Sequence, residues 1–397
     1  MPCDVLLLTN LYPPIQIGGY EIAARDVAEG LRDRGVSVHV LASDYRASEF
    51  QLQESDVSRT LKLTGSWFGD YHVNSPFDNS KLNFVRTKEL LVRIRPRLVY
   101  AWNQANLGAG PIVAAQYENI PILHHVMGYD ILSYRRRCAT VKATVKEVLR
   151  RIRYSAWRNY RLDDQHLSQI IFLSRFMEDY YRREGVCPAF SKVIYPGIAV
   201  DTIRCKDHYQ INDGVVDVAF LGQLAPHKGV LEVKSALHNL AVSQPERKFR
   251  LTLLGTGEEN FVRKLIQPAA VEVVHRGFVS RGDLYQQLAD YDIGVFSSTW
   301  EEPFGIAQIE MMAAGLPLVS SGTGGAAEPL DNMENALVYN AKDPEDMERK
   351  FAFLIGNYEN LAKHLGQTAR KTIEGRFSLE VMHASIFETV SRLMPKQ

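Results

Sequence analysis

Two glutamates flank the expected start of a helix in the second half of the chain. Glu302 comes just before Pro303 and Gly305, which open the helix. Glu310 lies about a turn and a half into it, with seven residues between the two glutamates. The helix follows a strand, and parallel α/β sheets bind ligands at the carboxyl ends of their strands. Because Gly305 has no Cβ, an anionic ligand can approach the free backbone N–H groups at the helix start.

The two carboxylates suit different parts of a phosphorylated ligand. Glu310 would repel a phosphate, but it could accept two hydrogen bonds from a ribose diol. Glu302 precedes the helix and is expected on the other side of the phosphates, toward an attached sugar. Taken alone, the pattern also fits a structural pair, with Glu302 or Glu301 beside the helix dipole and Glu310 on the surface. The apolar turn Met311 to Ala314 favours burial of Glu310, and a buried carboxylate needs a partner.

A lysine on a second predicted turn offers a positive charge. Lys228 lies within Gly222 to Gly229, which follows the first strand of a second strand–helix series. In a doubly wound sheet this loop also points to the carboxyl edge, where a cation could neutralise a diphosphate. As a lone lysine, however, it would more often be a surface residue.

Parallel sheets would have to position these residues, and the sequence predicts two of them. The strand Val5 to Thr9 is followed by a helix that Gly18-Gly19 opens and by the strand Val36 to Leu41. Strand, glycine turn, helix and strand form the βαβ unit of a parallel sheet. Further strands are expected at 97–101, 121–126, 170–173 and 192–195 in the first half, and at 216–221, 249–254, 271–275, 292–296 and 316–320 in the second.

The predicted fold class is therefore α/β, with two Rossmann-like doubly wound domains facing across a cleft. Asp201 to Gly214 is polar, lacks an apolar period and suits a linker between them. The expected division is an N-terminal domain at 1–205, a C-terminal ligand-binding domain at 206–376, and a final helix at 377–397 that packs back on the first domain.

The composition argues against several classes of protein. Lys+Arg and Asp+Glu each number 46, and a zero net charge argues against broad nucleic-acid binding. The apolar runs are too short for a membrane-spanning helix or a signal peptide. None of the four cysteines lies in a CxxC pair or near a His at metal-ligand spacing, which argues against a disulfide scaffold or a zinc site. These features predict a soluble, cytoplasmic protein.

One basic segment departs from the neutral total. Arg135 to Arg161 contains ten Lys and Arg residues and one acid, Glu147. Its valines and Ile152 could share a helix face beside the cations, and a basic amphipathic helix can rest on anionic lipid or hold a phosphorylated substrate. The other interpretation is a solvated helix whose charges cover the domain. Peripheral contact with an anionic membrane is therefore one of two open expectations for this segment.

The second half resembles the nucleotide-binding domain of the retaining glycosyltransferases of family 4, which have the GT-B fold. The most specific match is Glu302 and Glu310 within Glu-Pro-Phe-Gly…Glu-Met-Met-Ala-Ala-Gly-Leu-Pro, followed by Gly324-Gly325 and Glu328. The resemblance spans nearly the whole chain, more loosely in the first half. The supporting matches are Gly222…Lys228-Gly229, Leu254-Gly255-Thr256-Gly257, Gly277-Phe278, Gly18-Gly19, Ser174-Arg175-Phe176-Met177, Tyr195-Pro196-Gly197 and Phe377-Ser378.

The resemblance implies a metal-independent transfer of a hexose-type sugar, with retention at the anomeric carbon, from a nucleotide-diphosphate sugar to a hydroxyl acceptor. Glu302 and Lys228 would be catalytic, near the donor sugar and on the diphosphate, and Glu310 would bind the ribose. No separate cofactor is expected, and a UDP-sugar is favoured over a GDP-sugar. The residues expected to bind this donor are Gly18, Gly19, Gln223, Lys228, Gly277, Phe278, Glu302, Phe304, Gly305, Ile306 and Glu310.

Two positions depart from the family's pattern. Gln223 stands where members usually have an arginine, so the leaving diphosphate loses a cation. Met127 stands where many members have a histidine; His124 and His125 precede it in a strand, where at most one would face the cleft. These departures keep two alternatives open: a nucleotide-sugar epimerase of the same fold, and a non-catalytic protein that binds a nucleotide sugar.

Overall fold

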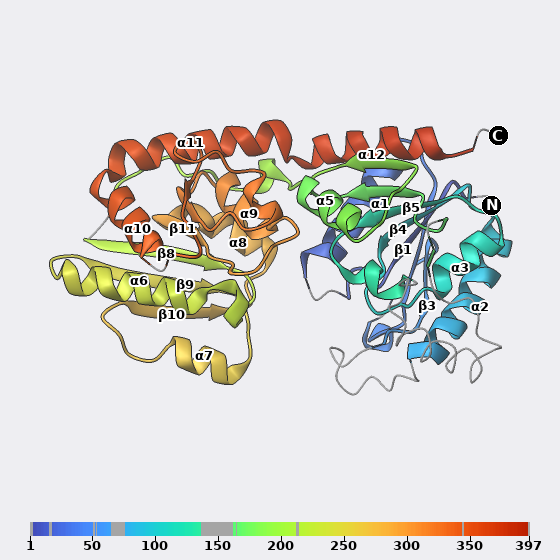
Figure 1. Cartoon of the computed structure of the whole chain (residues 1–397), viewed down its shortest axis with the longest axis horizontal. Helices are drawn as coiled ribbons and strands as arrows, with labels where there is room; N and C mark the ends of the chain where they lie inside the picture. Colours follow the sequence, from blue (N-terminus) through green and yellow to red (C-terminus); the bar gives the residue numbers. More distant parts are fainter. Residues whose placement is uncertain are drawn as a thin grey trace. The chain divides into compact units, whose positions relative to one another are not determined.

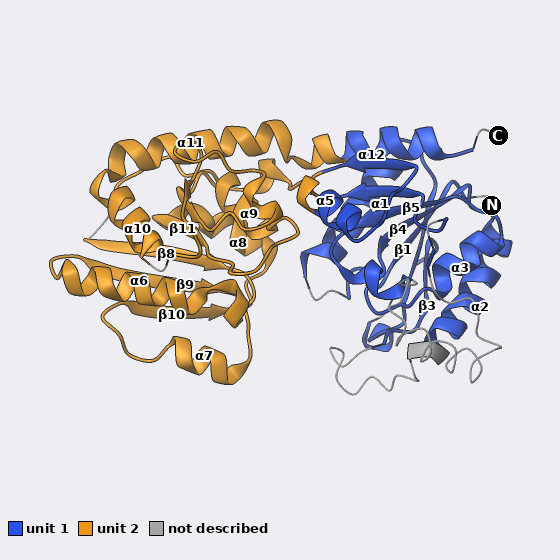
Figure 2. Cartoon of the chain, viewed as in Figure 1, with its two compact units in different colours: residues 1–173, 177–194, 383–397 blue, residues 174–176, 195–382 orange. Residues whose placement is uncertain are grey.

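The computed structural model of the chain describes residues 3–15, 18–50, 52, 54–64, 76–135, 162–163, 165–211, 214–343 and 345–395 (Figure 1). These residues form two compact units (Figure 2). The first unit comprises residues 1–173, 177–194 and 383–397, and the second comprises residues 174–176 and 195–382. Each unit is built on one parallel β-sheet.

The sheet of the first unit has the strand order β3-β2-β1-β4-β5-β6-β7, and each neighbouring pair is parallel. Every residue of β1 is buried, as expected for a continuous apolar strand that is covered on both faces. The strands are β1 (Val5–Thr9), β2 (Val38–Ser43), β3 (Val57–Leu61), β4 (Leu98–Asn103), β5 (Ile122–Val126), β6 (Gln169–Phe172) and β7 (Phe190–Val193), and the helices are α1 (Gly19–Arg32), α2 (Pro76–Ile94), α3 (Gly110–Tyr117) and α5 (Arg175–Arg183).

The sheet of the second unit has the order β10-β9-β8-β11-β12-β13, again with parallel pairs. Helix α6 packs against β9 and α10, while α9 packs against β11, β12 and α11. The strands are β8 (Val215–Leu221), β9 (Lys248–Leu254), β10 (Glu272–Gly277), β11 (Ile293–Phe296), β12 (Leu318–Ser320) and β13 (Leu337–Val338), and the helices are α6 (Val230–Ser243), α7 (Glu259–Leu265), α8 (Arg281–Gln287), α9 (Ile306–Ala313), α10 (Asp346–Gly356) and α11 (Tyr358–Arg376).

Both sheets reverse their strand order at one point. The second sheet runs outward from β8 through β9 to β10 on one side, and from β11 through β12 to β13 on the other. The first sheet reverses in the same way between β1 and β4. This is the strand order of the Rossmann fold, in which ligands bind beyond the carboxyl ends of the two strands at the reversal. The fold therefore singles out the loops after β1, β4, β8 and β11.

Helix α12 (Leu379–Leu393) begins in the second unit and ends in the first. Within the first unit, Glu388 of this helix forms an ion pair with Lys192 at 2.7 Å. Gly30 of α1 leaves room for His383, since an added Cβ would lie 2.5 Å from its Nδ1. These contacts hold the end of α12 to its unit.

The segment expected to act as a linker packs against the second unit instead. The Lys206 N–H donates to Ala314 O at 2.8 Å, and the buried Tyr209 hydroxyl donates to Gly315 O at 2.9 Å. The Lys206 side chain is also buried, and its Nζ donates to Tyr291 O at 2.7 Å. The linker interpretation is wrong for residues 203–211, because they belong to the second unit and Lys206 and Tyr209 are held within it.

Strands β3 and β13 and helix α2 are among the elements that the sequence patterns did not predict. Strand β3 is only partly buried, so it lacks an apolar run. Helix α2 turns polar side chains inward: Asn79, Asn83 and Thr87 recur every four residues and are all buried. The Asn83 amide nitrogen donates to Leu107 O at 2.9 Å. Strand β13 has two residues, too few for a pattern.

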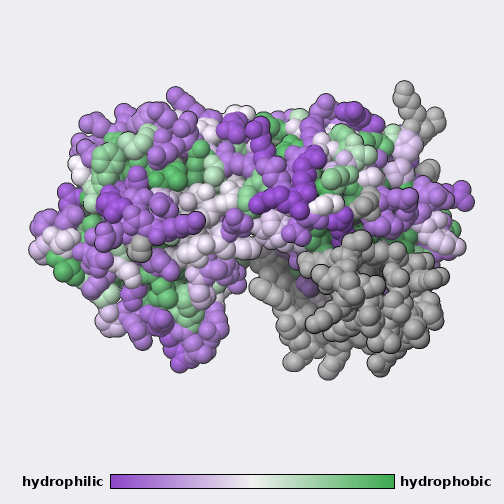
Figure 3. Space-filling view, in the orientation of Figure 1, coloured by the Kyte–Doolittle hydropathy of each residue, from purple (hydrophilic) through white to green (hydrophobic). Residues whose placement is uncertain are grey.

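Among the described residues, no helix combines the length and the apolar character needed to cross a bilayer. On the face that Figure 3 shows, hydrophilic residues surround scattered hydrophobic ones. Of the basic segment Arg135 to Arg161, only Arg135 lies within the described residues, and its guanidinium donates to Glu184 O at 2.6 Å. The rest of that segment lies outside them.

A buried carboxyl group lies at the opposite edge of the second sheet, just before β11. Asp292 is 7% exposed, and its Oδ2 accepts a hydrogen bond from Asp217 N at 2.8 Å. Burial raises the pKa of Asp292 to about 6, although the nearby positive charge of Lys206 and the Asp217 N–H oppose the shift. Tyr358 fixes the local backbone by donating to Asp292 O at 2.8 Å.

This raised pKa predicts a pH-dependent stability. The folded pKa lies above the unfolded one, so the folded state binds more protons between about pH 4 and pH 6, and stability falls as pH rises through that window. The contribution between pH 4.5 and 7.5 is about 2 kcal/mol. We expect Asp292→Asn, whose amide oxygen can still accept from Asp217 N, to remove this part of the slope in thermal unfolding. Parallel pH profiles for both proteins would contradict the assignment.

Candidate functional site

The loops after β8 and β11 meet where the second sheet reverses its order. Strands β8 and β11 are adjacent and parallel, so residues 222–229 and 297–305 leave the sheet at the same edge. The first loop carries Lys228 and the second carries Glu302. Both residues were predicted from sequence, and the structure brings them together at the position where a doubly wound fold binds its ligand.

Gly229 allows the two loops to approach each other. It has a φ of 69°, in the left-handed region, and an added Cβ would lie well inside van der Waals contact of Ser297 O. The Ser297 hydroxyl donates to Lys228 O at 2.8 Å, and the Thr299 N–H donates to His227 O at 2.9 Å. These bonds fix the backbone that carries Lys228.

The buried Glu302 forms an ion pair with the half-buried Lys228. Lys228 Nζ lies 2.5 Å from Glu302 Oε1, and the Ser298 hydroxyl donates to the same oxygen at 2.7 Å. Glu302 is 5% exposed, so its charge needs these two partners. Burial and the Lys228 charge lower the pKa of the adjacent His227, whose imidazole is therefore neutral near pH 7. The indole of Trp300 lies 5.6 Å from Lys228 Nζ.

Two glycines support Glu302 from the loop after β12. Gly324 pairs with Glu302 in a parallel bridge, and the Gly325 N–H donates to Glu302 O at 2.7 Å. An added Cβ on Gly324 would lie 2.6 Å from Glu302 O, and one on Gly325 would collide with Pro303 O. Glycine is therefore needed at 324 and 325, because the backbone there lies against the backbone of Glu302 and Pro303.

Helix α9 begins beside this pair. Its first residue, Ile306, follows Gly305, which has a φ of 92° and whose Cβ position is 2.9 Å from the Phe296 ring. The first N–H groups of a helix have no intrahelical partner and carry the positive end of its dipole. Phe304 is fully buried, and its ring lies 5.7 Å from that of Tyr195.

Glu310 lies on α9 with its side chain 12% exposed, so the interpretation as a surface residue is wrong. Its Oε1 accepts a hydrogen bond from the Tyr285 hydroxyl at 3.0 Å, and Arg281 Nε lies 3.6 Å from the same oxygen. Burial raises the pKa of Glu310, while Arg281 and the Tyr285 hydroxyl oppose that shift. The buried carboxylate therefore has the partners that its setting requires.

The other donor-binding residues predicted in the second unit lie on neighbouring turns. Gly277 has a φ of 69°, its oxygen accepts from Gly255 N at 2.9 Å, and the following Phe278 is 74% exposed. Gln223 is also exposed, next to Leu224, whose N–H donates to Thr256 O at 2.8 Å. Gly277, Phe278 and Gln223 can therefore be reached from solvent.

Gly18 and Gly19 lie at the reversal point of the first sheet, after β1. Both are exposed, and Gly19 begins α1. The Gly18 N–H donates to Glu21 Oε2 at 2.8 Å, and Trp102 Nε1 at the end of β4 donates to Tyr20 O at 3.0 Å. The first turn of α1 is thereby anchored to its own sheet.

The histidines near Met127 are structural. His124 and His125 are both buried, and burial lowers their pKa to about 4 and about 3. His124 Nε2 donates to His166 O at 2.8 Å, and His125 Nδ1 lies 2.7 Å from the Tyr100 hydroxyl. Met127 is buried as well. Neither His124 nor His125 therefore presents an exposed imidazole at the end of β5.

Three polar residues that contact the predicted carboxylates were not predicted from the sequence. Ser298 lies four residues before Glu302, and Arg281 and Tyr285 are four residues apart on α8. The spacing of Arg281 and Tyr285 was a usable signal, because residues four apart share one helix face. Nothing in the sequence, however, pairs that face with Glu310.

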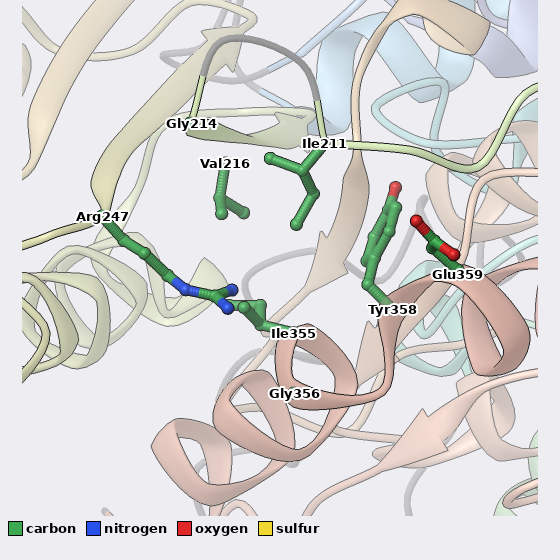
Figure 4. Close-up of a pocket in the computed structure, with 8 residues that line it drawn as sticks. All are labelled: Ile211, Gly214, Val216, Arg247, Ile355, Gly356, Tyr358 and Glu359. Carbon is green, nitrogen blue, oxygen red and sulfur yellow. The ribbon is translucent and has the colours of Figure 1, made fainter.

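A separate cavity lies at the other edge of the second sheet. It has a volume of about 430 Å³, and the residues that Figure 4 labels come from β8 and the segment before it, from the residue before β9, and from α10 and α11. None of the predicted site residues lines it; the lining residues are Ile211, Gly214, Val216, Arg247, Ile355, Gly356, Tyr358 and Glu359. The candidate site is therefore identified by its chemistry and its place in the fold.

Comparisons with known proteins match both halves of the chain to sugar-transferring families. Residues 17–202 match the family described as Glycosyltransferase Family 4, and residues 203–372 match the family described as Glycosyl transferases group 1. The chain belongs to the glycosyltransferases. The boundary between the two matches lies close to the start of the segment that packs on the second unit.

This glycosyltransferase has similar proteins in other organisms. An uncharacterized glycosyltransferase of Methanocaldococcus jannaschii is 22% identical over 394 residues, 94% of each chain. The GDP-mannose-dependent monoacylated alpha-(1-6)-phosphatidylinositol monomannoside mannosyltransferase of Corynebacterium glutamicum is 21% identical over 395 residues, 95% of each chain. The crystal structure of Anabaena HepE in complex with UDP and glucose matches with a TM-score of 0.68 and 20% identity, covering 98% of this chain and 100% of that one. The fold is the two-domain GT-B fold.

The close contact between Gly229 and the backbone oxygen of Ser297 predicts that Gly229 tolerates no side chain. In Gly229→Ala the new Cβ meets Ser297 O and also requires a left-handed φ, which together cost roughly 2 to 4 kcal/mol. Gly356→Ala is the matched control, since a Cβ there meets nothing within 4 Å. We expect thermal unfolding monitored by circular dichroism to show a lower Tm for Gly229→Ala only. Equal Tm values for the two variants would contradict the close approach of the loops.

Proposed function

We propose that this glycosyltransferase moves a hexose-type sugar from a nucleotide-diphosphate sugar to a hydroxyl acceptor, retains the configuration at the anomeric carbon, and needs no metal ion. The observation that carries the proposal is the ion pair of the buried Glu302 with Lys228, 2.5 Å apart, at the point where the second sheet reverses and α9 begins. A charged pair placed there suits a ligand that has both a diphosphate and a sugar.

Lys228 and the start of α9 would hold the diphosphate. An ammonium group has three N–H donors, and Glu302 takes one of those of Lys228. The Lys228 side chain is 22% exposed, so the remaining donors can reach phosphate oxygens. The N–H groups of Gly305 and Ile306, at the start of α9, would add a second positive region. Together they would stabilise the charge that develops on the leaving diphosphate without a divalent ion.

The nucleoside would extend from the diphosphate toward Glu310 and the turn at Gly277. Glu310 is the one predicted carboxylate whose partners are a hydroxyl and a guanidinium rather than Lys228, and a carboxylate can accept from both hydroxyls of a ribose. The exposed backbone around Gly277 and Phe278 would contact the base. Gly18 and Gly19 of the first unit stay predicted donor-binding residues.

Retention follows if the acceptor attacks from the face that the diphosphate leaves. The acceptor oxygen then bonds to the anomeric carbon as the bond from that carbon to the phosphate oxygen breaks, and the leaving diphosphate takes the acceptor's proton. Lys228 would stabilise that leaving group. Glu302, held in place by Lys228 and Ser298, would accept hydrogen bonds from the donor sugar.

The proposed donor is a UDP-sugar. HepE, whose fold this chain shares, was crystallised with UDP and glucose, whereas the Corynebacterium glutamicum relative is described as GDP-mannose-dependent. A thermal-shift screen of UDP, GDP and then their sugars tests the choice of base. Nucleotide release that depends on an added acceptor indicates transfer, whereas product formed without an acceptor would favour an epimerase.

The proposed location is the cytoplasm, with an anionic membrane as a further partner through Arg135 to Arg161. Sedimentation with vesicles of neutral lipid, and of neutral plus anionic lipid, tests that partner directly. Binding that appears only with anionic lipid and weakens at high salt is the expected result. Equal recovery in the supernatant with both vesicles would remove the membrane from the proposal.

The donor site makes a direct prediction for two variants. Lys228→Ala removes the cation from the diphosphate, and Glu310→Ala removes the acceptor for the ribose, so each should lower turnover by about a hundredfold or more. The exposed residues Lys264 and Glu246 provide matched controls as alanine variants. Turnover is measured as acceptor-dependent nucleotide release, with circular dichroism to confirm folding. Unchanged turnover in both site variants would defeat the assignment.

A further inference from the structure

A chain of three polar side chains joins α8 to α9 next to the proposed ribose site. Arg281 Nε donates to the Tyr285 hydroxyl at 2.5 Å, and that hydroxyl donates to Glu310 Oε1 at 3.0 Å. Arg281 also stacks on the tyrosine, with its guanidinium carbon 5.3 Å from the ring centroid. Arg281 and Tyr285 are four residues apart, so both extend from one face of α8.

The setting of these groups fixes their charge states. Tyr285 is 4% exposed, and burial together with the Glu310 charge raises the pKa of its phenol, which stays a hydrogen-bond donor at any working pH. Arg281 is 28% exposed and carries a permanent positive charge 3.6 Å from Glu310 Oε1. The charge and the hydrogen bond both favour the ionised form of Glu310 against its burial.

The two oxygens of Glu310 differ in their contacts with the protein. Among the residues that the structure describes, Oε1 accepts from Tyr285 and faces Arg281, while Oε2 takes part in no hydrogen bond. A carboxylate held by one oxygen cannot rotate freely, so its second oxygen keeps a fixed direction. The segment that carries Gly277 and Phe278 leads directly into α8, which begins at Arg281. The base-contacting turn and the partners of Glu310 are therefore one continuous piece of chain.

We propose that Arg281 and Tyr285 are positioning residues that hold Glu310 by one oxygen, so that the other selects nucleotides with a ribose 2′-hydroxyl over their 2′-deoxy counterparts. This inference rests on the proposed donor site. It adds to that site a specificity device built from α8, whose residues touch the carboxylate and act on the ligand through it. The hydroxyl of Tyr285 is the central group, because it contacts both Arg281 and Glu310.

The test compares binding of two ligands by three proteins. Isothermal titration calorimetry measures the Kd of UDP and 2′-deoxy-UDP, or of GDP and 2′-deoxy-GDP if the protein binds GDP instead. Tyr285→Phe removes only the hydroxyl and keeps the buried ring. Tyr291→Phe is the matched control, since its hydroxyl lies in the same unit, is partly buried and donates to Gln287 Oε1 at 3.2 Å.

We expect the unaltered protein to prefer the ribonucleotide by about tenfold or more, as for a hydrogen bond to a charged group. Tyr285→Phe should weaken ribonucleotide binding by about tenfold and leave the 2′-deoxy Kd nearly unchanged, so the preference disappears. Tyr291→Phe should keep it. Arg281→Gln, which removes the charge, should reduce the preference as well, whereas Arg281→Lys should retain most of it.

The outcomes separate this inference from the proposed function. If the unaltered protein binds the nucleotide but Tyr285→Phe keeps its preference, or weakens both ligands equally, the positioning role is overturned and the donor site stands. If the unaltered protein binds neither UDP nor GDP, the donor site and the positioning role both fall.

Discussion

A buried carboxylate beside an ammonium group is the constraint on which the rest of the site depends. Glu302 is 5% exposed, and its charge would be strongly destabilising there without Lys228 and Ser298. The loops after β8 and β11 must therefore stay within hydrogen-bonding distance. Gly229 permits that approach from one side, and Gly324 and Gly325 permit it under Glu302. Each of these positions requires glycine, because a backbone oxygen lies too close to the place that a Cβ would take.

In the proposed function, the ion pair would link the fold to the chemistry of sugar transfer. Lys228 is held in position before any substrate arrives, so a diphosphate would meet a prearranged cation rather than a mobile side chain. The carboxylate of Glu310 is likewise held in place before a substrate binds, by the hydroxyl of Tyr285 on α8. A site organised in this way spends little binding free energy on fixing its own side chains, which leaves more for the donor.

The sequence predicted the parts of this protein that rest on local patterns. The buried strands of both sheets are apolar runs, which predicted the α/β class. Lys228 and Glu302 lie in loops that follow strands and Glu310 lies on a helix, and the family resemblance that these residues carry implied the GT-B fold. Helix α2 could not be predicted in this way, because it buries the polar Asn79, Asn83 and Thr87 as well as the apolar Leu90 and Leu91. The contact between Tyr285 and Glu310 joins residues 25 apart on different helices, and no periodicity encodes it.

The most direct test of the account is a crystal structure of the protein soaked with UDP and, separately, with GDP. The account predicts electron density for a diphosphate within hydrogen-bonding distance of Lys228 Nζ and the first N–H groups of α9, with the ribose at Glu310. A nucleotide bound elsewhere, or a Lys228–Glu302 pair without density beside it at saturating nucleotide, would contradict the central claim.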